Sequence, residues 1–169
     1  MTSIEGRTLK YSDSVNQFKA VKNQTPLYNN EVVTTDSSGV TVIDFNDEVI
    51  GTVVLAPNTQ VILRKSNTDG IRLLSLIRGH LRLYRGKQYF EKKVGVLINI
   101  RDNPTAYHGT NFEVHYSKES KKVTSFNDTL RKFTLRKNEV EKKPLSTPEK
   151  ADILDQELLE DLKFLREST

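Results

Sequence analysis

The chain has 169 residues, of which 36% are hydrophobic and 28% charged, a composition typical of an ordinary globular protein rather than a disordered one. No stretch reaches the roughly 20 apolar residues of a membrane helix, and there is no cysteine for disulfides or thiolate chemistry. The net charge is +4, but seven acids oppose three bases from Thr147 onward, so this tail carries −4 and the preceding residues carry +8. A basic body of this kind can attract its own acidic tail, a polyanion or an acidic partner.

The N-terminus contains Ile4-Glu5-Gly6-Arg7, the recognition sequence of a protease that removes expression tags. Residues 1–7 are therefore expected to be either native or derived from such a tag. No apolar segment follows a basic start, so this N-terminus lacks the pattern of a secretory signal. The protein is accordingly expected either to be cytoplasmic or to have lost its targeting segment.

Short runs of alternating apolar and polar residues extend from about Lys19 to about Leu135. This period is typical of half-buried strands rather than of helices. Turn-forming residues interrupt the runs about every ten residues, for example at Ser37-Ser38-Gly39 and at Pro57-Asn58. The pattern predicts an all-β fold and leaves a sandwich, a barrel and a short-strand solenoid open. The clearest predicted strands are residues 40–45, 60–63 and 80–84, and the pattern continues at residues 94–100, 111–116 and 129–135.

A helical pattern begins after the β region. Ser146-Thr147-Pro148-Glu149 combines a capping hydroxyl, a first-turn proline and a glutamate that can reach back to the cap. Apolar residues then recur at spacings of three and four, which predicts one amphipathic helix to about Arg166. We expect its apolar face to pack on its own β domain, with partner binding or self-association as the alternative. The face comprises Ala151, Leu154, Leu158, Leu162 and Leu165, widened by Leu159 and Phe164.

Three histidines, His80, His108 and His115, are the residues best suited to proton transfer near neutral pH. His80 and His115 alternate with Leu81 and Val114, which places both on the polar face of their predicted strands. None of the three has the helical spacing of a zinc protease, and no cysteine is present as a further ligand. No metal site is therefore expected.

Other catalytic patterns are also missing from the sequence. Serine nucleophile motifs, phosphate-binding glycine loops and EF-hand spacing are absent. Asp44, Asp47 and Glu48 lie close together, but at an apparent turn where acids are common. We therefore expect neither an enzyme nor a cofactor.

A basic cluster surrounds Tyr84, Tyr89 and Phe90. Interleaved cations and aromatic rings can bind single-stranded nucleic acid or another polyanion. A solvated hairpin whose charges protect an edge from aggregation is the structural alternative. No recognised nucleic-acid motif accompanies the cluster, so nucleic acid is not expected as the ligand. The cluster comprises Arg78, Arg82, Arg85, Lys87, Lys92 and Lys93.

Several short signatures follow one another in a fixed order. Val54–Leu63 contains Pro57-Asn58-Thr59, Leu73–Leu83 contains Gly79, and Ala106–Val114 contains Gly109-Thr110 followed by Phe112. Over roughly residues 5–137 this series resembles the FecR domain. The pattern of that family has a Pro-Asn-Thr strand start, a Leu-x-x-Gly-x-x-arginine hairpin and a late Gly-Thr-x-Phe-x-Val. The matching residues are interpreted as structural: Pro57, Asn58, Thr59, Gly79, Gly109, Thr110 and Phe112.

The sequence departs from the family pattern at three turns. Asn30-Glu31 stands where Gly-Asp is usual, Asn46-Asp47-Glu48 replaces an Asp-Gly turn, and Phe126-Asn127-Asp128 replaces a late Glu-Gly turn. Asparagine adopts positive φ more readily than most residues, so these changes are compatible with the turns. Gly109 is expected to hold such a φ between two strands.

The resemblance implies a short-strand β-sandwich or solenoid-like FecR domain at residues 8–143, followed by a linker and one acidic C-terminal α-helix at residues 144–169. It further implies a periplasmic, non-enzymatic module that relays signals or acts as a scaffold by binding another envelope protein. A signal or anchor segment would then be missing from this sequence. The alternative, drawn from the basic cluster, is a module that binds a glycan or polyanion such as peptidoglycan through a basic face.

Overall fold

The computed structural model describes residues 1–12, 17–45, 51–64, 71–84, 95–101, 103–108, 111–126 and 130–134. These residues form strands and turns and contain no helix, so the predicted all-β character is confirmed. Within them, accordingly, no helix has the length and hydrophobicity of a membrane span. The strands are β1 (Thr2–Glu5), β2 (Thr8–Ser12), β3 (Gln17–Ala20), β4 (Val32–Thr35), β5 (Val40–Asp44), β6 (Thr52–Leu55), β7 (Gln60–Arg64), β8 (Ile71–Tyr84), β9 (Gly95–Ile100), β10 (Thr105–His108), β11 (Asn111–Tyr116), β12 (Lys121–Ser125) and β13 (Arg131–Thr134).

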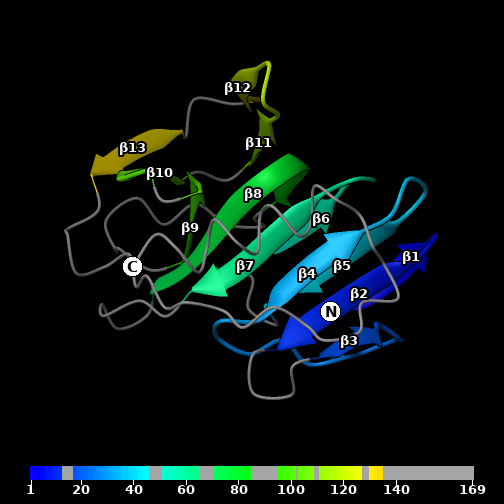
Figure 1. Ribbon diagram of the computed structural model, residues 1–169. Helices are drawn as coiled ribbons and strands as arrows, with labels where there is room; N and C mark the ends of the chain where they lie inside the picture. The colour runs from blue at the N-terminus through cyan, green and yellow to red at the C-terminus, as the bar shows by residue number, and fades with distance from the viewer. Residues whose placement is uncertain are drawn as a thin grey trace.

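The strands form two hydrogen-bonded groups that share β8 (Figure 1). Sheet A has the order β1-β5-β6-β8-β11-β12, and sheet B has the order β3-β2-β4-β7-β8-β9-β10-β13. β8 pairs with β7 through its first half, Leu73–Arg78, and with β6 through its second half, Leu81–Tyr84. These pairs are antiparallel, whereas β8 and β9 run parallel.

Gly79 lies at the point where β8 passes from one sheet to the other. Its φ is +103°, a conformation that side chains rarely adopt. Immediately before it, a bulge between Gln60 and Val61 shifts the register of β7 against β8. The bulge and Gly79 together allow β8 to pair with strands of both sheets.

One hydrophobic core draws its side chains from strands of both sheets. Apolar side chains alternate with outward-facing ones along the strands, as half-buried strands require. The hydroxyl groups of Thr8 on β2 and Thr41 on β5 hydrogen-bond to each other and so join sheet B to sheet A. The core contains Val33, Ile43, Val53, Leu55, Val61, Leu63, Leu74, Leu76, Leu81, Leu83, Val96, Ile98, Ile100, Tyr107, Phe112 and Val114.

Each of the six predicted strands overlaps a strand of the structure, namely β5, β7, β8, β9, β11 and β13. The alternating pattern begins only near Lys19, whereas β1 and β2 of the structure precede it and β3 begins at Gln17. β1, which falls within the segment of uncertain origin, pairs with β5. The polar strand β12 also escaped prediction.

Several predicted features lie outside the described residues. They are Asp47 and Glu48, the residues Gly109 and Thr110, and the C-terminal helix with Leu154, Leu158, Leu162 and Leu165. At the substituted turn where Asn30 replaces glycine, the structure has a φ of 67°, a left-handed value.

Candidate functional site

The outer face of sheet A carries a group of polar and aromatic side chains that contact one another. Leu81 and Leu83 of β8 point into the core, so the alternating residues of that strand point outward. The same alternation on β11 turns its polar residues outward. We call this surface the Arg82 face; it comprises His80, Arg82, Tyr84, Asn111, Glu113, His115 and Phe126.

Arg82 lies at the centre of this face. Its Nε and Nη2 donate to Asn111 Oδ1 at 3.3 and 3.2 Å, and its Nη1 lies 3.6 Å from Glu113 Oε1. The guanidinium carbon is 4.6 Å from the centroid of the Tyr84 ring and 4.2 Å from that of the Phe126 ring. A planar guanidinium stacks well on aromatic rings, so Arg82 is held between two of them in one orientation.

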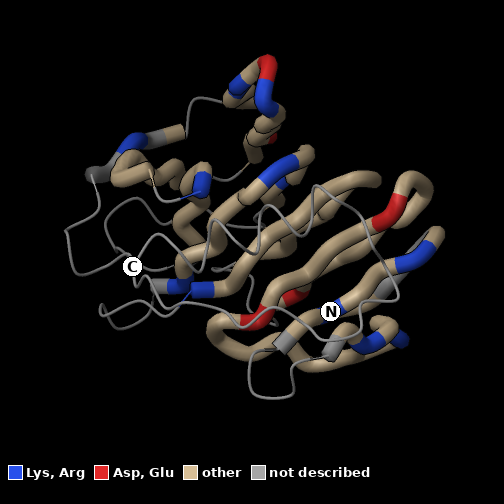
Figure 2. The backbone as a smooth tube through the Cα atoms, in the orientation of Figure 1, with Lys and Arg blue, Asp and Glu red and all other residues tan. Residues whose placement is uncertain are grey.

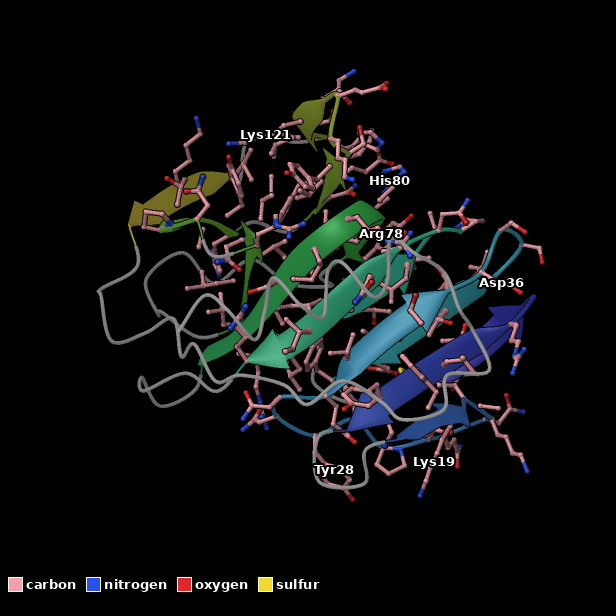
Figure 3. All side chains as sticks on the ribbon, in the orientation of Figure 1. Lys19, Tyr28, Asp36, Arg78, His80 and Lys121 are labelled. Atoms are coloured by element: carbon pink, nitrogen blue, oxygen red, sulfur yellow. The ribbon has the colours of Figure 1, made fainter. Side chains whose placement is uncertain are left out.

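The two flanking rings are open to solvent. Tyr84 is 41% exposed and Phe126 is 46% exposed. Among the described residues the one other large hydrophobic side chain with comparable exposure is Tyr28, which lies far from His80 (Figure 3). Two exposed rings around one arginine form an apolar patch with a fixed cation at its centre.

Two histidines border the patch. His80 Nε2 lies 3.2 Å from Glu113 Oε2, and the rings of His80 and His115 face each other edge to face at 6.0 Å between centroids. His115 Nδ1 lies 3.3 Å from Ser120 Oγ. No group of three His, Cys, Asp or Glu residues in the described part of the chain can hold a metal ion. Through these contacts His80 and His115 place hydrogen-bonding groups at the rim of the face.

Of the six residues in the predicted basic cluster, the structure describes only Arg78 and Arg82. Arg78 is 7% exposed and its Nη1 donates to the carbonyl oxygen of Asn58 at 3.1 Å. The sequence suggested that Arg78 and Arg82 share one open basic surface. In the structure Arg78 is instead held against the Pro57-Asn58 turn. Arg85, Lys87, Lys92 and Lys93 lie outside the described residues, as do Tyr89 and Phe90.

The charged residues that the structure describes are also dispersed over the molecule. In Figure 2 most charged residues lie near strand ends and in turns, and acids and bases alternate along the β11–β12 hairpin. Arg82 itself is paired with Glu113, which reduces its attraction for a polyanion.

The motif Pro57-Asn58-Thr59 lies against β8 beside the Arg82 face. Thr59 is buried, and its Oγ1 accepts the backbone N–H of His80 at 3.0 Å. The Thr59 backbone N–H donates to Thr35 Oγ1 at 2.9 Å, while Asn58 has a left-handed φ of 55°. This turn therefore fixes the backbone from which His80 and Arg82 project. Phe112, at 0% exposure, packs beneath the face from β11.

A hollow of about 650 Å³ opens near the other end of β8. Its walls include Leu27, Phe45 and Leu63, and its charged side chains are Asp44 and Arg72. Burial lowers the pKa of the Met1 amino group, which also lines the hollow, and Asp44 opposes this shift. Among the described lining residues there is no pair of acids and no histidine, so the hollow offers no evident set of catalytic groups.

Comparison with known proteins gave no match, whether with family models, with curated proteins or with solved structures.

Proposed function

We propose that this chain is a non-enzymatic protein-interaction domain of the FecR type that acts in the periplasm and binds another envelope protein through the Arg82 face. The observation that carries this proposal is the position of Arg82 between two exposed aromatic rings. Tyrosine, phenylalanine and arginine are enriched at protein interfaces, and tyrosine and arginine supply much of the binding energy there.

Preorganisation of the arginine supports the same function. Asn111 and Glu113 already hold the guanidinium, so a partner does not have to order this side chain on binding. The partner would gain free energy mainly by covering Tyr84 and Phe126. Half-buried Val42 and Val54 continue the surface across β5 and β6, because Val54 is the cross-strand neighbour of Arg82.

The proposal includes the arrangement of the strands, the C-terminal helix and the periplasmic location. The FecR-like signatures favour a short-strand sandwich or solenoid followed by a C-terminal helix, with a role in signal relay or as a scaffold. Phe112, Pro57 and Thr59 are buried or hydrogen-bonded where such signatures would act as fold determinants. A partner within the envelope follows from the family resemblance.

Binding of peptidoglycan or another polyanion has less support. The arginines that the structure describes in the predicted cluster are either buried, as Arg78 is, or paired with a carboxylate, as Arg82 is. A polyanion site needs several unpaired cations whose contacts weaken steeply with added salt.

Photo-crosslinking on the full chain tests the proposed face. A photoreactive phenylalanine at Thr124, which neighbours Glu113 on β12, should capture one reproducible envelope protein, whereas the same group at Tyr28 should not. The captured protein, once purified, should bind the wild-type chain and bind the Arg82→Ala and Phe126→Ala variants about tenfold or more weakly. Tyr28→Ala is the matched control and should bind normally.

Two results would contradict the proposal. Equal capture from both positions would show that the Arg82 face is not selective. Binding to peptidoglycan that is lost between low and moderate salt, without any effect of Phe126→Ala, would instead support the polyanion alternative.

A further inference from the structure

Both faces of sheet B are buried: the face that contributes to the core and the opposite face, which points away from the core. Cross-strand neighbours form one row on it, running Tyr11, Val32, Ile62, Ser75 and Asn99. The adjoining positions add Leu9, Leu73 and Leu97. None of these eight side chains is more than 8% exposed, although their neighbours in sequence are the residues that face sheet A. We call this surface the outer face of sheet B.

No described element packs over this surface. Figure 1 shows β2, β4 and β7 toward the viewer with no other described strand in front of them. The connection from β3 to β4 lies at the sheet edge, where Lys10 Nζ contacts Glu31 Oε2 at 3.1 Å and the carbonyl oxygen of Pro26 at 3.0 Å. Lys10 lies on the core side of β2, because it alternates with Leu9 and Tyr11. The outer face therefore needs cover from another part of the chain or from a partner.

Polar side chains interrupt the outer face at its centre. Arg64 Nε donates to Ser75 Oγ at 2.9 Å, and Ser75 Oγ donates to Asn99 Oδ1 at 2.5 Å. Gln60 is 0% exposed, and neither atom of its side-chain amide has a hydrogen-bond partner among the residues that the structure describes. An unpartnered buried amide is costly, so a surface that retains one is suited to an occupant that brings polar groups.

We propose that the acidic C-terminal segment, residues 144–169, docks on the outer face of sheet B. The sequence predicts an amphipathic helix there, with one apolar face and a tail charge of −4, and the outer face supplies apolar side chains together with Arg64 and Arg78. Opposite charge and a matching apolar stripe make the segment and the surface complementary.

The position and length of the chain fit this assignment. The described structure ends at Thr134 on β13, which pairs with β10 within sheet B, and 35 residues follow. A helix from Thr147 to Arg166 would be about 30 Å long. Five strands from β2 to β9 span roughly 19 Å at ordinary strand spacing, so one helix can cross the whole surface. This docking does not involve the Arg82 face and stands apart from the proposed function.

Cysteine labelling of the full chain tests the docking, because the protein has no cysteine of its own. Ile62→Cys places a thiol on the outer face, and Val61→Cys places one on the core face of the same strand. Both thiols should react slowly in the otherwise wild-type chain. Adding Leu158→Asp and Leu162→Asp should accelerate labelling of Ile62→Cys about tenfold or more while Val61→Cys stays protected. Unchanged protection of Ile62→Cys would overturn the proposal.

A bridging experiment decides the matter even if the double tail variant unfolds. Ile62→Cys combined with one cysteine at Leu154, Leu158, Leu162 or Leu165 should give an intrachain product with a short bis-maleimide in at least one combination. Val61→Cys should give none. Bridging at none of the four positions, or bridging only between two copies of the chain, would overturn the proposal; the second result would assign the surface to a dimer.

Discussion

Thr59 packs directly against the backbone of Gly79, and a Cβ atom added to that glycine would lie 2.5 Å from Thr59 Cα. The contact joins the turn before β7 to the point where β8 changes sheets. Gly79→Ala should therefore destabilise the protein by about 1 to 3 kcal/mol or more, through its positive φ and through the clash. Denaturant unfolding measures the loss, with His80→Ala on the neighbouring position as the control. An unchanged midpoint for Gly79→Ala would contradict this account of the turn.

The hydroxyl group of Thr59 has a separate energetic role. It accepts the His80 backbone N–H at 3.0 Å and lies 3.1 Å from the His80 carbonyl oxygen, at a buried position. Thr59→Val keeps the volume but removes these bonds, so it should cost about 1 to 3 kcal/mol of unfolding free energy. Thr59→Ser retains the hydroxyl and should lose less. Equal losses in the two variants would show that packing, rather than hydrogen bonding, is what Thr59 contributes.

Asp36 predicts a pH dependence of stability. Burial acts to raise the pKa of this carboxyl, but the backbone N–H groups of Arg7, Ser38 and Gly39 outweigh it and hold the pKa below its ordinary value. The Asp36 Oδ1 distances to the N–H groups of Arg7 and Ser38 are 3.2 and 3.1 Å. Since the folded state binds its proton less readily than the unfolded chain, the stabilisation is present above the ordinary pKa and disappears as the pH falls through the folded one.

Asp36→Asn should accordingly be less stable than the wild type near neutral pH, and the difference should shrink as the pH approaches about 3. Urea midpoints measured across this range give the comparison, with the exposed Glu119→Gln as the control. A difference that stayed constant with pH would mean that the charge of Asp36 contributes nothing.

Ser75 links Arg64 to Asn99 inside sheet B, where all three side chains are buried. Ser75→Ala should cost about 1 to 3 kcal/mol, because it removes a bond from each of two buried polar groups. The exposed hydroxyl of Ser120 provides the comparison, and Ser120→Ala should change the unfolding free energy by about 0.5 kcal/mol or less. If Ser75→Ala lowers the unfolding free energy no more than Ser120→Ala does, the hydrogen bonds of Ser75 do not contribute to stability.

Strand alternation allowed much of the β structure to be predicted. The run from His80 to Tyr84 places Leu81 and Leu83 inward and His80 and Arg82 outward, and the structure has them so. The strand β12, with the sequence Lys-Lys-Val-Thr-Ser, has no such signal, because its burial is intermediate at most and comes from pairing with β11. A strand that forms because it pairs with a neighbouring strand, and not because its own residues alternate, cannot be predicted from its sequence pattern.

The Arg82 face was beyond the reach of sequence patterns for the same reason. Arg82, Glu113 and Phe126 are up to 44 positions apart, and only the pairing of β8, β11 and β12 brings them together. From the sequence, the closely spaced arginines and lysines between Arg78 and Lys93 predicted a continuous basic surface rather than this mixed aromatic and polar face. Alternation placed Arg82 outward, but the register shift between the pairs Val61–Leu76 and Gln60–Arg78 interrupts the period, and Arg78 donates to the carbonyl oxygen of Asn58.

The membership of β8 in both sheets bears on how the domain folds. The first half of β8 pairs with β7 and β9 and its second half with β6 and β11, so four other strands depend on this one segment. Neither sheet can open along β8 without exposing core side chains of the other. The two sheets are therefore expected to form one cooperative unit rather than two separately unfolding halves. A change that loosens Gly79 would then be transmitted to β3 and β13 alike, at the distant edges of sheet B.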